Sequence, residues 1–488
     1  MNSTKKLKLY RFNIDILSFF FFSLLALFLF TIPARAEVCD GDEEYRLDKS
    51  IPVEMDLLRF RQAYSEFYSR TPSPEGEIRL PAEFEPMDTV FYAWEVGDSD
   101  FYCNLTQEVV KDKRVNVVVM HHGVEEREDI CDCLGRLSSL PLESVEMLDM
   151  SKIGPYYEWK EDPRIFDEDD ENDDLNEYSD RGSSLRKGEN HTQPDIGDDL
   201  PWTTGWPWGR SLDSDWSRDW GPFFIELQGA EGTSQAIVGF RYDLFRVNDD
   251  AVPFKLANIY DLPVFLSPYE MDGGNIITDG RGTCFLSWDP DYTEDLPNRE
   301  SIERELNAYL GCKSFVWLRS MEREPTGHVD IFMKVAQPNL VMVGSYELKD
   351  DQNNSYLLDY NAGIIADETN VENEPFEVIR VPMPNNSDGV FRTYLNSLVL
   401  NDRVIVPVFY NDREYEDQAL SIYASAFPNR EIVTIDAEAL MGRGGAVRCA
   451  TSIRPAHEET AKNRISGLES DLIHSEGGIT MAEECEGP

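Results

Sequence analysis

One structural unit recurs along this chain, and it restricts the folds that the chain can adopt. The unit is a β-hairpin, then a helix, then a further strand, and we expect it at least three times between residues 202 and 449. The clearest hairpins are expected over 275–288, 330–346 and 396–410, and amphipathic helices over 298–311 and 413–427. A repeated mixed unit of this size indicates a radial α/β arrangement around a central site.

The sequence before residue 202 contributes elements of the same two kinds. "DTVFYAWEV" (88–96) predicts a strand, and residues 100–123 predict a helix followed by a strand. Residues 55–70 carry apolar side chains at helical spacing, so we expect a helical lead-in over 37–79. The chain is 41% hydrophobic and 11% aromatic, which is enough for a sizeable core.

The acidic balance limits the class of partner. The formal net charge is -47, so the phosphate backbone of a nucleic acid would be repelled. The same charge fits solubility, a cationic substrate or a salt-rich environment. We therefore expect no nucleic-acid partner.

The first 36 residues have the pattern of an export signal. A basic segment over 1–11 precedes an apolar run over 16–32, and "PARA" offers a small-residue cleavage site after Ala36. The apolar run is long for a signal, so an uncleaved membrane anchor is the alternative. No other segment is apolar enough to cross a bilayer. We expect a secreted or periplasmic protein with no stable membrane span after cleavage.

Two acidic segments interrupt or follow the regular pattern. Residues 158–200 are dense in acids and poor in apolar side chains, which predicts a solvated, disordered insertion. A calcium site is the alternative, although the spacing lacks the glycine and glutamate of an EF-hand loop. The tail over 456–488 is acidic and polar, and it is too short for another domain.

Cysteine usage fits an oxidising compartment. An exported chain favours disulfides, but the sequence does not give their pairing. If one cysteine stays free for chemistry, the remaining seven cannot all pair, so at least one more is expected to be free. "CDC" at 131–133 is too short for a typical zinc knuckle, and no second cysteine-histidine cluster completes a metal site.

Four glycine-containing segments at strand or hairpin edges carry candidate chemistry: 216–222, 271–275, 326–332 and 442–449. In an extended strand His328 and Asp330 would project from the same face, so the acid would hold a cation while the imidazole moves a proton. A surface His-Asp pair is the alternative interpretation of this spacing.

Asp219 follows Arg218 and is flanked by Trp216 and Trp220. This aromatic setting would strengthen an ionic contact to a planar cation. An internal bridge between Arg218 and Asp219 in a turn is the alternative.

Cys449 follows a glycine-rich run, and it must ionise to act as a nucleophile. Arg448 and a protonated His328 would both lower its pKa. A structural thiol behind a turn is the alternative.

Together, a cysteine, a histidine and two aspartates suit attack on a guanidinium carbon. Carboxylates grip the nitrogens of this planar cation and fix its carbon against the thiolate. The histidine then protonates the leaving ammonia and activates water to hydrolyse the intermediate. No metal and no organic cofactor is required.

Six segments in order resemble one enzyme family. "PAEFEPMDTVFYAW", "WSRDWGP", "MDGGN", "GHVDIF", "NSLVLNDRVIVPVFY" and "GRGGAVRCATSIRP" are similar to segments of agmatine deiminases and porphyromonas-type peptidylarginine deiminases. The resemblance covers residues 80–455 apart from the acidic insertion. It implies the pentein fold, a five-bladed α/β propeller with its active site on the axis.

The resemblance also implies roles for particular residues. Cys449 matches the nucleophile, His328 the general acid/base, and Asp219 and Asp330 the guanidinium-binding acids. The remaining matches are expected to bind substrate, and they are Trp216 as an aromatic wall, Asp272 and Gly274 in "MDGGN", Asn396 in "YLNSL", and Arg246 in "DLFRVNDD".

Some positions depart from the family pattern. The family usually has histidine directly before the nucleophile, where this chain has Arg448, and agmatine deiminases usually have glutamate where it has Asp272. Secreted peptidyl enzymes look to have two arginines before an Asn-Asp pair. This chain keeps Arg246 but has Leu244 at the other place, and it has no room for their immunoglobulin-like domain.

The export signal argues against a cytoplasmic role in polyamine synthesis. We therefore expect a deiminase acting on peptidyl-arginine or free arginine, with agmatine as the second substrate. A non-catalytic binder of arginine-containing peptides and an amidinotransferase of the same fold are the alternatives. The sequence predicts no oligomeric state.

Overall fold

The computed structural model describes residues 71–121, 123–150, 212, 214–229, 232–242, 247–288, 298–456 and 479–480. Contacts divide the chain into Met1–Met55 and Asp56–Pro488, and all described residues belong to the second unit. The export signal, most of the expected helical lead-in, the acidic insertion, Arg246 and most of the tail lie outside the described residues.

The strands of this unit form five separate sheets. Each sheet repeats one pattern, in which an antiparallel pair is extended by a parallel strand. In order along each sheet, the strands are β17 (Ser452–Pro455), β2 (Met87–Ala93), β3 (Asn116–His121), β4 (Val145–Asp149) and β18 (Ile479–Thr480); β1 (Glu77–Arg79), β5 (Phe223–Gly229), β6 (Gly232–Arg241) and β7 (Val264–Glu270); β8 (Ile277–Thr278), β9 (Thr283–Trp288) and β10 (Ser314–Arg319); β11 (Met333–Gln337), β12 (Leu340–Ser345) and β13 (Glu377–Pro382); and β14 (Leu398–Val399), β15 (Arg403–Val408) and β16 (Glu431–Asp436).

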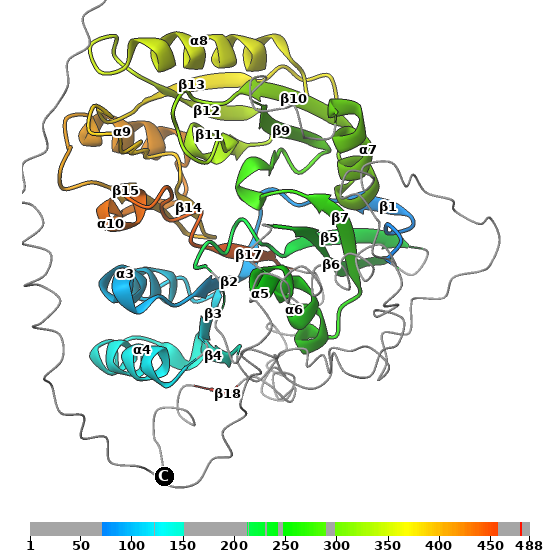
Figure 1. The fold of residues 1–488 in the computed structure, drawn as a ribbon, viewed down its shortest axis with the longest axis vertical. Helices are drawn as coiled ribbons and strands as arrows, with labels where there is room; N and C mark the ends of the chain where they lie inside the picture. The colour runs from blue at the N-terminus through cyan, green and yellow to red at the C-terminus, as the bar shows by residue number, and fades with distance from the viewer. Residues whose placement is uncertain are drawn as a thin grey trace, which may run out of the picture. The chain divides into compact units, whose positions relative to one another are not determined.

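Helices connect the parallel strands, as the geometry of a parallel crossover requires. Figure 1 shows α3, α4, α7, α8 and α9 toward the outside of the unit, and strands β2, β14 and β17 closer to its centre. The described α-helices are α3 (Ser99–Val109), α4 (Val124–Arg136), α5 (Val247–Asp250), α6 (Val252–Tyr260), α7 (Arg299–Leu310), α8 (Gln352–Asp367), α9 (Glu416–Ala426) and α10 (Glu438–Met441).

Local sequence explains these boundaries. In α7 the Asn298 side chain caps the first turn by accepting a hydrogen bond from the backbone N–H of Ser301, and Gly311 ends the helix in a left-handed conformation. Ile302 and Leu306 bury one face of the helix against the core.

The two ends of the expected domain meet in one sheet. β17, which begins three residues after Cys449, pairs antiparallel with β2 near the start of the domain. This pairing closes the succession of sheets and brings residues far apart in sequence to a common centre.

Two disulfides join neighbouring elements of the fold. Cys103 and Cys133 join α3 to α4, and Cys284 and Cys312 join β9 to the segment after α7. Cys131 is disulfide-bonded as well, whereas Cys449 is the free cysteine in the described part of the chain.

The expected α/β fold is confirmed, with five sheets where the sequence repeat was recognised three times. Two boundaries differ from expectation. Residues 77–79 form β1 instead of the end of a helical lead-in, because they pair with β5. Residues 479–480 of the tail form β18 against β4. Among the described helices, none has the length and apolar character to cross a membrane.

Candidate functional site

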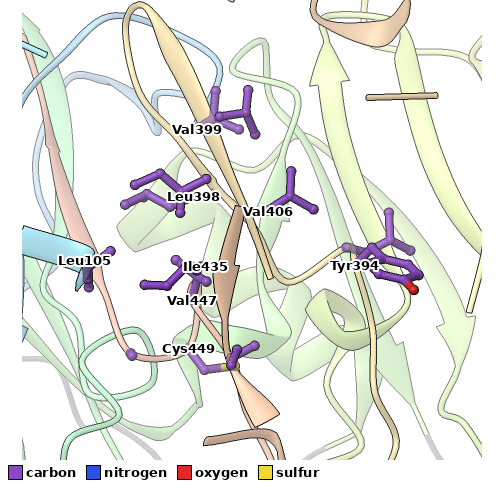
Figure 2. Close-up of a cluster of buried hydrophobic side chains, with 14 of the residues drawn as sticks. Leu105, Tyr394, Leu398, Val399, Val406, Ile435, Val447 and Cys449 are labelled. Carbon is purple, nitrogen blue, oxygen red and sulfur yellow. The ribbon is translucent and has the colours of Figure 1, made fainter. Parts of the chain in front are cut away.

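The segment that carries Cys449 is fixed in the largest hydrophobic core. Val447 and Cys449 are buried in this core, and Figure 2 shows Val447 beside Ile435 and Cys449 at the lower end of the drawn cluster. Packing of the flanking residues therefore holds the thiol in one position.

The glycines before Cys449 allow the backbone to approach the Trp216 ring closely. A Cβ on Gly445 would lie 2.5 Å from a Trp216 ring carbon and 2.8 Å from the Cβ of Cys449. Gly444 has a φ of +107°, which side-chain-bearing residues rarely adopt. The glycine-rich run thus lets Trp216 lie directly against the nucleophile segment.

Asn396 holds the thiol and its backbone together. Its Nδ2 donates to Cys449 Sγ over 3.0 Å, and its Oδ1 accepts from the backbone N–H groups of Cys449 and Ala446 at 3.1 and 3.2 Å. Asn396 is itself fully buried. These contacts fix the position of the Cys449 thiol.

The environment of Cys449 favours the neutral thiol. Burial raises the pKa of Cys449 well above its ordinary value, and Asp330 and Asp219 add to the rise, while Arg448 and Asn396 oppose it. The Sγ donates to Asp330 Oδ2 at 3.5 Å, as a protonated thiol would. The expected lowering of the pKa by Arg448 is confirmed, but burial and the two carboxylates outweigh it, so the pKa of Cys449 lies above its ordinary value.

His328 lies between two carboxylates. Its Nε2 is 2.9 Å from Asp272 Oδ2 and its Nδ1 is 3.6 Å from Asp219 Oδ1. Burial alone would lower the pKa of His328, but Asp219 and Asp272 raise it to about 10, with a further contribution from Asp330. The imidazole is therefore cationic at neutral pH and is poised to donate a proton.

The chain around His328 is a tight turn and not a strand. His328 caps a 3-10 helix over Val329–Ile331, and Gly327 has a φ of +67°. The expected strand was wrong, although both His328 and Asp330 reach the site. Glu324 fixes this turn by accepting from the N–H groups of Thr326 and Gly327. Sequence analysis did not single out Glu324.

Asp219 is placed by the 3-10 turn Gly273–Asn275. Its Oδ1 accepts from the N–H of Gly274 at 2.9 Å. A Cβ on Gly274 would lie 2.5 Å from both Asp219 Oδ1 and His328 Nδ1, so glycine is required there. Burial raises the pKa of Asp219 while protonated His328 opposes the rise, and Asp272 and Asp330 add to it. Extra positive charge nearby would favour the ionised form.

A second charged group lies on the side of Cys449 away from the carboxylates that flank His328. Arg448 Nη1 donates to Asp330 Oδ2 at 2.6 Å, and its Nε donates to Glu83 Oε1 at 2.7 Å. Glu83 also contacts Lys334 at 3.2 Å and Arg218 at 3.4 Å. Arg218 therefore pairs with Glu83, and the suggested bridge to Asp219 is not formed. We call Glu83, Arg218, Lys334 and Arg448 the rear ionic cluster.

Burial and charge shape this rear ionic cluster. Burial would raise the pKa of Glu83, but Arg448, Arg218 and Lys334 hold it well below its usual range. Burial lowers the pKa of Lys334 against the pull of Glu83. Glu83 and Lys334 were missed at the sequence level, because their partners lie hundreds of residues away.

A cavity of about 490 Å³ opens onto Cys449. Of the predicted residues, Trp216, Asp219, Asp272, His328 and Cys449 line it. Gly274, Asp330 and Asn396 do not line it, but each contacts a residue that does. Arg246 lies outside the described residues. The cavity is also lined by residues to which sequence analysis assigned no role of their own, namely Tyr242, Glu270, Pro325, Thr326, Arg443 and Gly444.

This arrangement suits a planar cation with a carbon electrophile. Asp219 and Asp272 supply negative charge, Trp216 supplies an aromatic wall, and His328 supplies a proton near the sulfur. The cavity volume is within the range of small-molecule sites.

Comparison with known proteins agrees with the geometry. The family described as Porphyromonas-type peptidyl-arginine deiminase matches residues 209–455. The agmatine deiminase of Medicago truncatula is 25% identical over 291 residues, which cover 50% of this chain and 77% of the plant protein.

Solved structures share the fold. The agmatine deiminase of Enterococcus faecalis superposes with a TM-score of 0.56 at 18% identity, over 79% of this chain and 99% of that one. A cysteine-to-serine variant of the agmatine deiminase of C. jejuni, with substrate bound, has a TM-score of 0.55 at 16% identity, over 78% and 96% of the two chains. At these identities the likeness is one of fold.

Proposed function

Because the chain belongs to the Porphyromonas-type peptidyl-arginine deiminase family, we propose that it hydrolyses the guanidinium group of arginine, free or in a peptide, to a ureido group and ammonia. The protein is a hydrolase of C–N bonds of the deiminase type. Its substrate is thus a small-molecule or peptide guanidinium, and the products from arginine are citrulline and ammonia.

One observation carries the proposal. Cys449, free and buried, lies on the wall of a cavity that also presents His328, Asp219 and Asp272. A structural thiol needs neither an amide donor on its sulfur nor a cationic imidazole on the same cavity wall. A nucleophile uses both.

We infer that the substrate itself activates the nucleophile. With the thiol neutral and the acids ionised, the charges around Cys449 balance. A guanidinium adds one positive charge, and ionisation of Cys449 restores the balance, so binding lowers the thiol pKa. The balancing groups are the acids Glu83, Asp219, Asp272 and Asp330 and the cations Arg218, His328, Lys334 and Arg448.

The proposed reaction has two halves. The Cys449 thiolate forms a C–S bond to the guanidinium carbon, and His328 protonates one nitrogen, so that the C–N bond breaks and ammonia leaves. A cationic thiouronium remains on the sulfur. Neutral His328 then takes a proton from water, the hydroxide adds to the carbon, and the C–S bond breaks. The hydroxyl proton is released to solvent as the C=O bond forms, which gives the ureido product and the thiolate, and the ammonia released earlier takes up one proton from solvent as ammonium.

Asp330 has a distinct place in this scheme. Its Oδ2 is held by Arg448, whereas its Oδ1 is buried with no hydrogen-bond partner among the described residues. A guanidinium is a donor without acceptors and would satisfy that oxygen. Because Asp330 Oδ2 lies 3.5 Å from Cys449 Sγ, a guanidinium bound against the thiol would also approach this carboxylate.

Agmatine is the second candidate substrate. The curated relative from Medicago truncatula is an agmatine deiminase, and two superposed structures are agmatine deiminases. Agmatine would give N-carbamoylputrescine by the same steps.

We also propose that the chain is exported, with cleavage after Ala36. The disulfides Cys103–Cys133 and Cys284–Cys312 support this, since such bonds persist in oxidising compartments. N-terminal sequencing of the mature protein from its native source should begin at Glu37. An N-terminus at Met1 would contradict cleavage.

A covalent probe separates the enzyme from a non-catalytic binder. 2-Chloroacetamidine carries the planar cation next to a displaceable chloride, and 2-chloroacetamide is its neutral control. We expect intact-mass analysis to show one amidine adduct at Cys449, much slower labelling by the amide, and no such adduct in Cys449→Ser. Equal labelling by both reagents would contradict recognition of the cation. Absence of any adduct would favour the binder.

A further inference from the structure

Arg443 is a cationic side chain on the wall of the same cavity as Cys449. It follows α10, six residues before the nucleophile, and its guanidinium carbon lies 5.1 Å from the centroid of the Trp216 ring. Trp216 in turn lies against Gly445. One indole therefore separates the guanidinium of Arg443 from the nucleophile segment.

Two carboxylates hold Arg443 in place without facing the cavity. Its Nη1 and Nη2 donate to Asp215 at 3.0 and 2.7 Å, and its Nη2 also donates to Asp98. Neither acid lines the cavity, and Tyr102 fixes Asp215 with a hydrogen bond of 2.7 Å. Burial would lower the pKa of Arg443, but Asp215 and Asp98 raise it above its usual range, so the charge is permanent.

Arg443 retains unused donors. A guanidinium has five N–H groups, and the bonds to Asp215 and Asp98 use three of them. The N–H on Nε and the second N–H on Nη1 have no partner among the described residues. The bridge to Asp215 fixes the plane of the guanidinium, so these donors point in set directions.

Depth in the cavity distinguishes Arg443 from the reacting groups. Cys449 is 2% exposed and the His328 side chain 6%, whereas the Arg443 side chain is 40% exposed. A substrate with its guanidinium at Cys449 therefore extends its other end toward the level of Arg443.

We propose that Arg443 is a specificity-determining residue that binds a carboxylate at the far end of the substrate. This rests on the proposed function and narrows its substrate class. Asp219, Asp272 and Glu270 make the rest of the cavity acidic, so Arg443 is the permanent cation among its described lining residues. A carboxylate at the end of the substrate opposite the guanidinium accepts hydrogen bonds from the free N–H groups of Arg443. Agmatine lacks this carboxylate and brings an ammonium instead.

The carboxylate has two sources, free arginine and the C-terminal arginine of a peptide. The test compares kcat/KM of the wild type for L-arginine, agmatine, Gly-Gly-Arg and Gly-Gly-Arg-amide. We expect arginine to exceed agmatine, and the peptide acid to exceed its amide, each by roughly 10- to 100-fold. Preference for the peptide acid over free arginine would identify the peptide as the source. Agmatine equal to or better than arginine would overturn the proposal.

Variants assign the preference to one side chain. In Arg443→Met the arginine-to-agmatine ratio should fall by roughly 10-fold or more, because a charge-assisted bond is lost. Arg443→Lys keeps the positive charge beside Asp215 and Asp98, so its arginine-to-agmatine ratio should fall less than that of Arg443→Met. Arg281→Met is the matched control, because Arg281 is also held by two carboxylates, Glu372 and Glu374, and does not line the cavity. An unchanged ratio in both Arg443 variants, or an equal fall for all substrates, would overturn the proposal.

Failure of the reaction is separable from failure of carboxylate recognition. Calorimetry on the Cys449→Ala protein gives the affinities for arginine and agmatine without turnover. One outcome is that the wild type releases no ammonia while Cys449→Ala binds arginine more tightly than agmatine. In that case the proposed function fails and the role of Arg443 stands. If agmatine binds as tightly as arginine, the role of Arg443 fails whatever the turnover.

Discussion

The two charged groups on either side of Cys449 are built from similar residues but are arranged in opposite ways. In the rear ionic cluster, Glu83 is surrounded by Arg448, Lys334 and Arg218, and Arg448 continues to Asp330. On the cavity wall, His328 is surrounded by Asp219 and Asp272. One group is an anion among cations, and the other is a cation among anions.

This difference separates a fixed region from a responsive one. The pairing behind Cys449 keeps Glu83 ionised and Asp330 in place whatever enters the cavity. On the cavity wall the pKa of Asp219 is raised and the thiol is neutral, so both respond to an incoming cation. Arg448 is thus part of the fixed region, which explains why this chain accepts arginine before the nucleophile.

The largest expected effect is on the responsive side. His328→Gln removes the proton donor and should lower kcat by about 10² to 10⁴, with little loss of folded protein. The measurement is ammonia release at saturating substrate, with circular dichroism as a check on folding. His121→Gln is the control, because His121 is buried but does not line the cavity. Equal losses in both variants would contradict a chemical role for His328.

On the fixed side we expect a loss of stability. Glu83→Gln leaves three buried cations without their shared anion and should lower the free energy of unfolding by about 3 to 5 kcal/mol. Urea unfolding measures it. Glu85→Gln is the control, since Glu85 is partly exposed and pairs with Arg79, and it should cost about 1 kcal/mol or less. Similar midpoints for both variants would show that the rear ionic cluster does not stabilise the fold.

The pH dependence of stability follows from the imidazole. The pKa of His328 is about 10 in the folded protein against 6.5 as a free side chain, so the folded state binds the proton more tightly. That stabilisation is complete below pH 6.5 and is lost as the pH rises toward 10, by roughly 4 to 5 kcal/mol. Wild type should lose more stability than His328→Gln over this window. If the free energy of unfolding fell equally with pH in the wild type and in His328→Gln, the raised pKa of His328 would be contradicted.

The smallest effect concerns the residue that joins the two regions. Arg448→Lys keeps the charge, but one ammonium bridges Glu83 and Asp330 less well than a guanidinium. We expect a loss of about 1 kcal/mol in stability and a fall of a few-fold in kcat/KM. The free energy of unfolding and kcat/KM are measured for Arg448→Lys and, as a control, for Lys334→Arg. An unchanged Arg448→Lys would show that the bridge is not required.

The sequence predicted which residues line the cavity better than it predicted the residues that surround them. Cys449, His328, Asp219 and Asp272 meet at one cavity as expected. Short motifs specify them because each lies within four residues of a glycine in the sequence. Glu83 was not predicted, since its partner Arg448 is 365 residues away and neither side chain stands in a distinctive pattern. Arg443 was not predicted either, because its role depends on Asp98 and Asp215.

Local structure was predicted less well where glycine sets the backbone. The His328–Asp330 spacing suggested a strand, but the positive φ of Gly327 turns the chain into a 3-10 helix. The repeated unit was recognised from its long hairpins. The closing pair of β17 and β2 was not predicted, because the four residues of β17 carry too little pattern to indicate their partner.

Ammonia release by the wild type beside Cys449→Ser, with arginine, agmatine and Gly-Gly-Arg as substrates, tests the central claim most directly. The account predicts ammonia and ureido product in equal amounts from the wild type, and neither from the folded variant. Equal release by both proteins, or no release by the wild type with any of the three substrates, would contradict it.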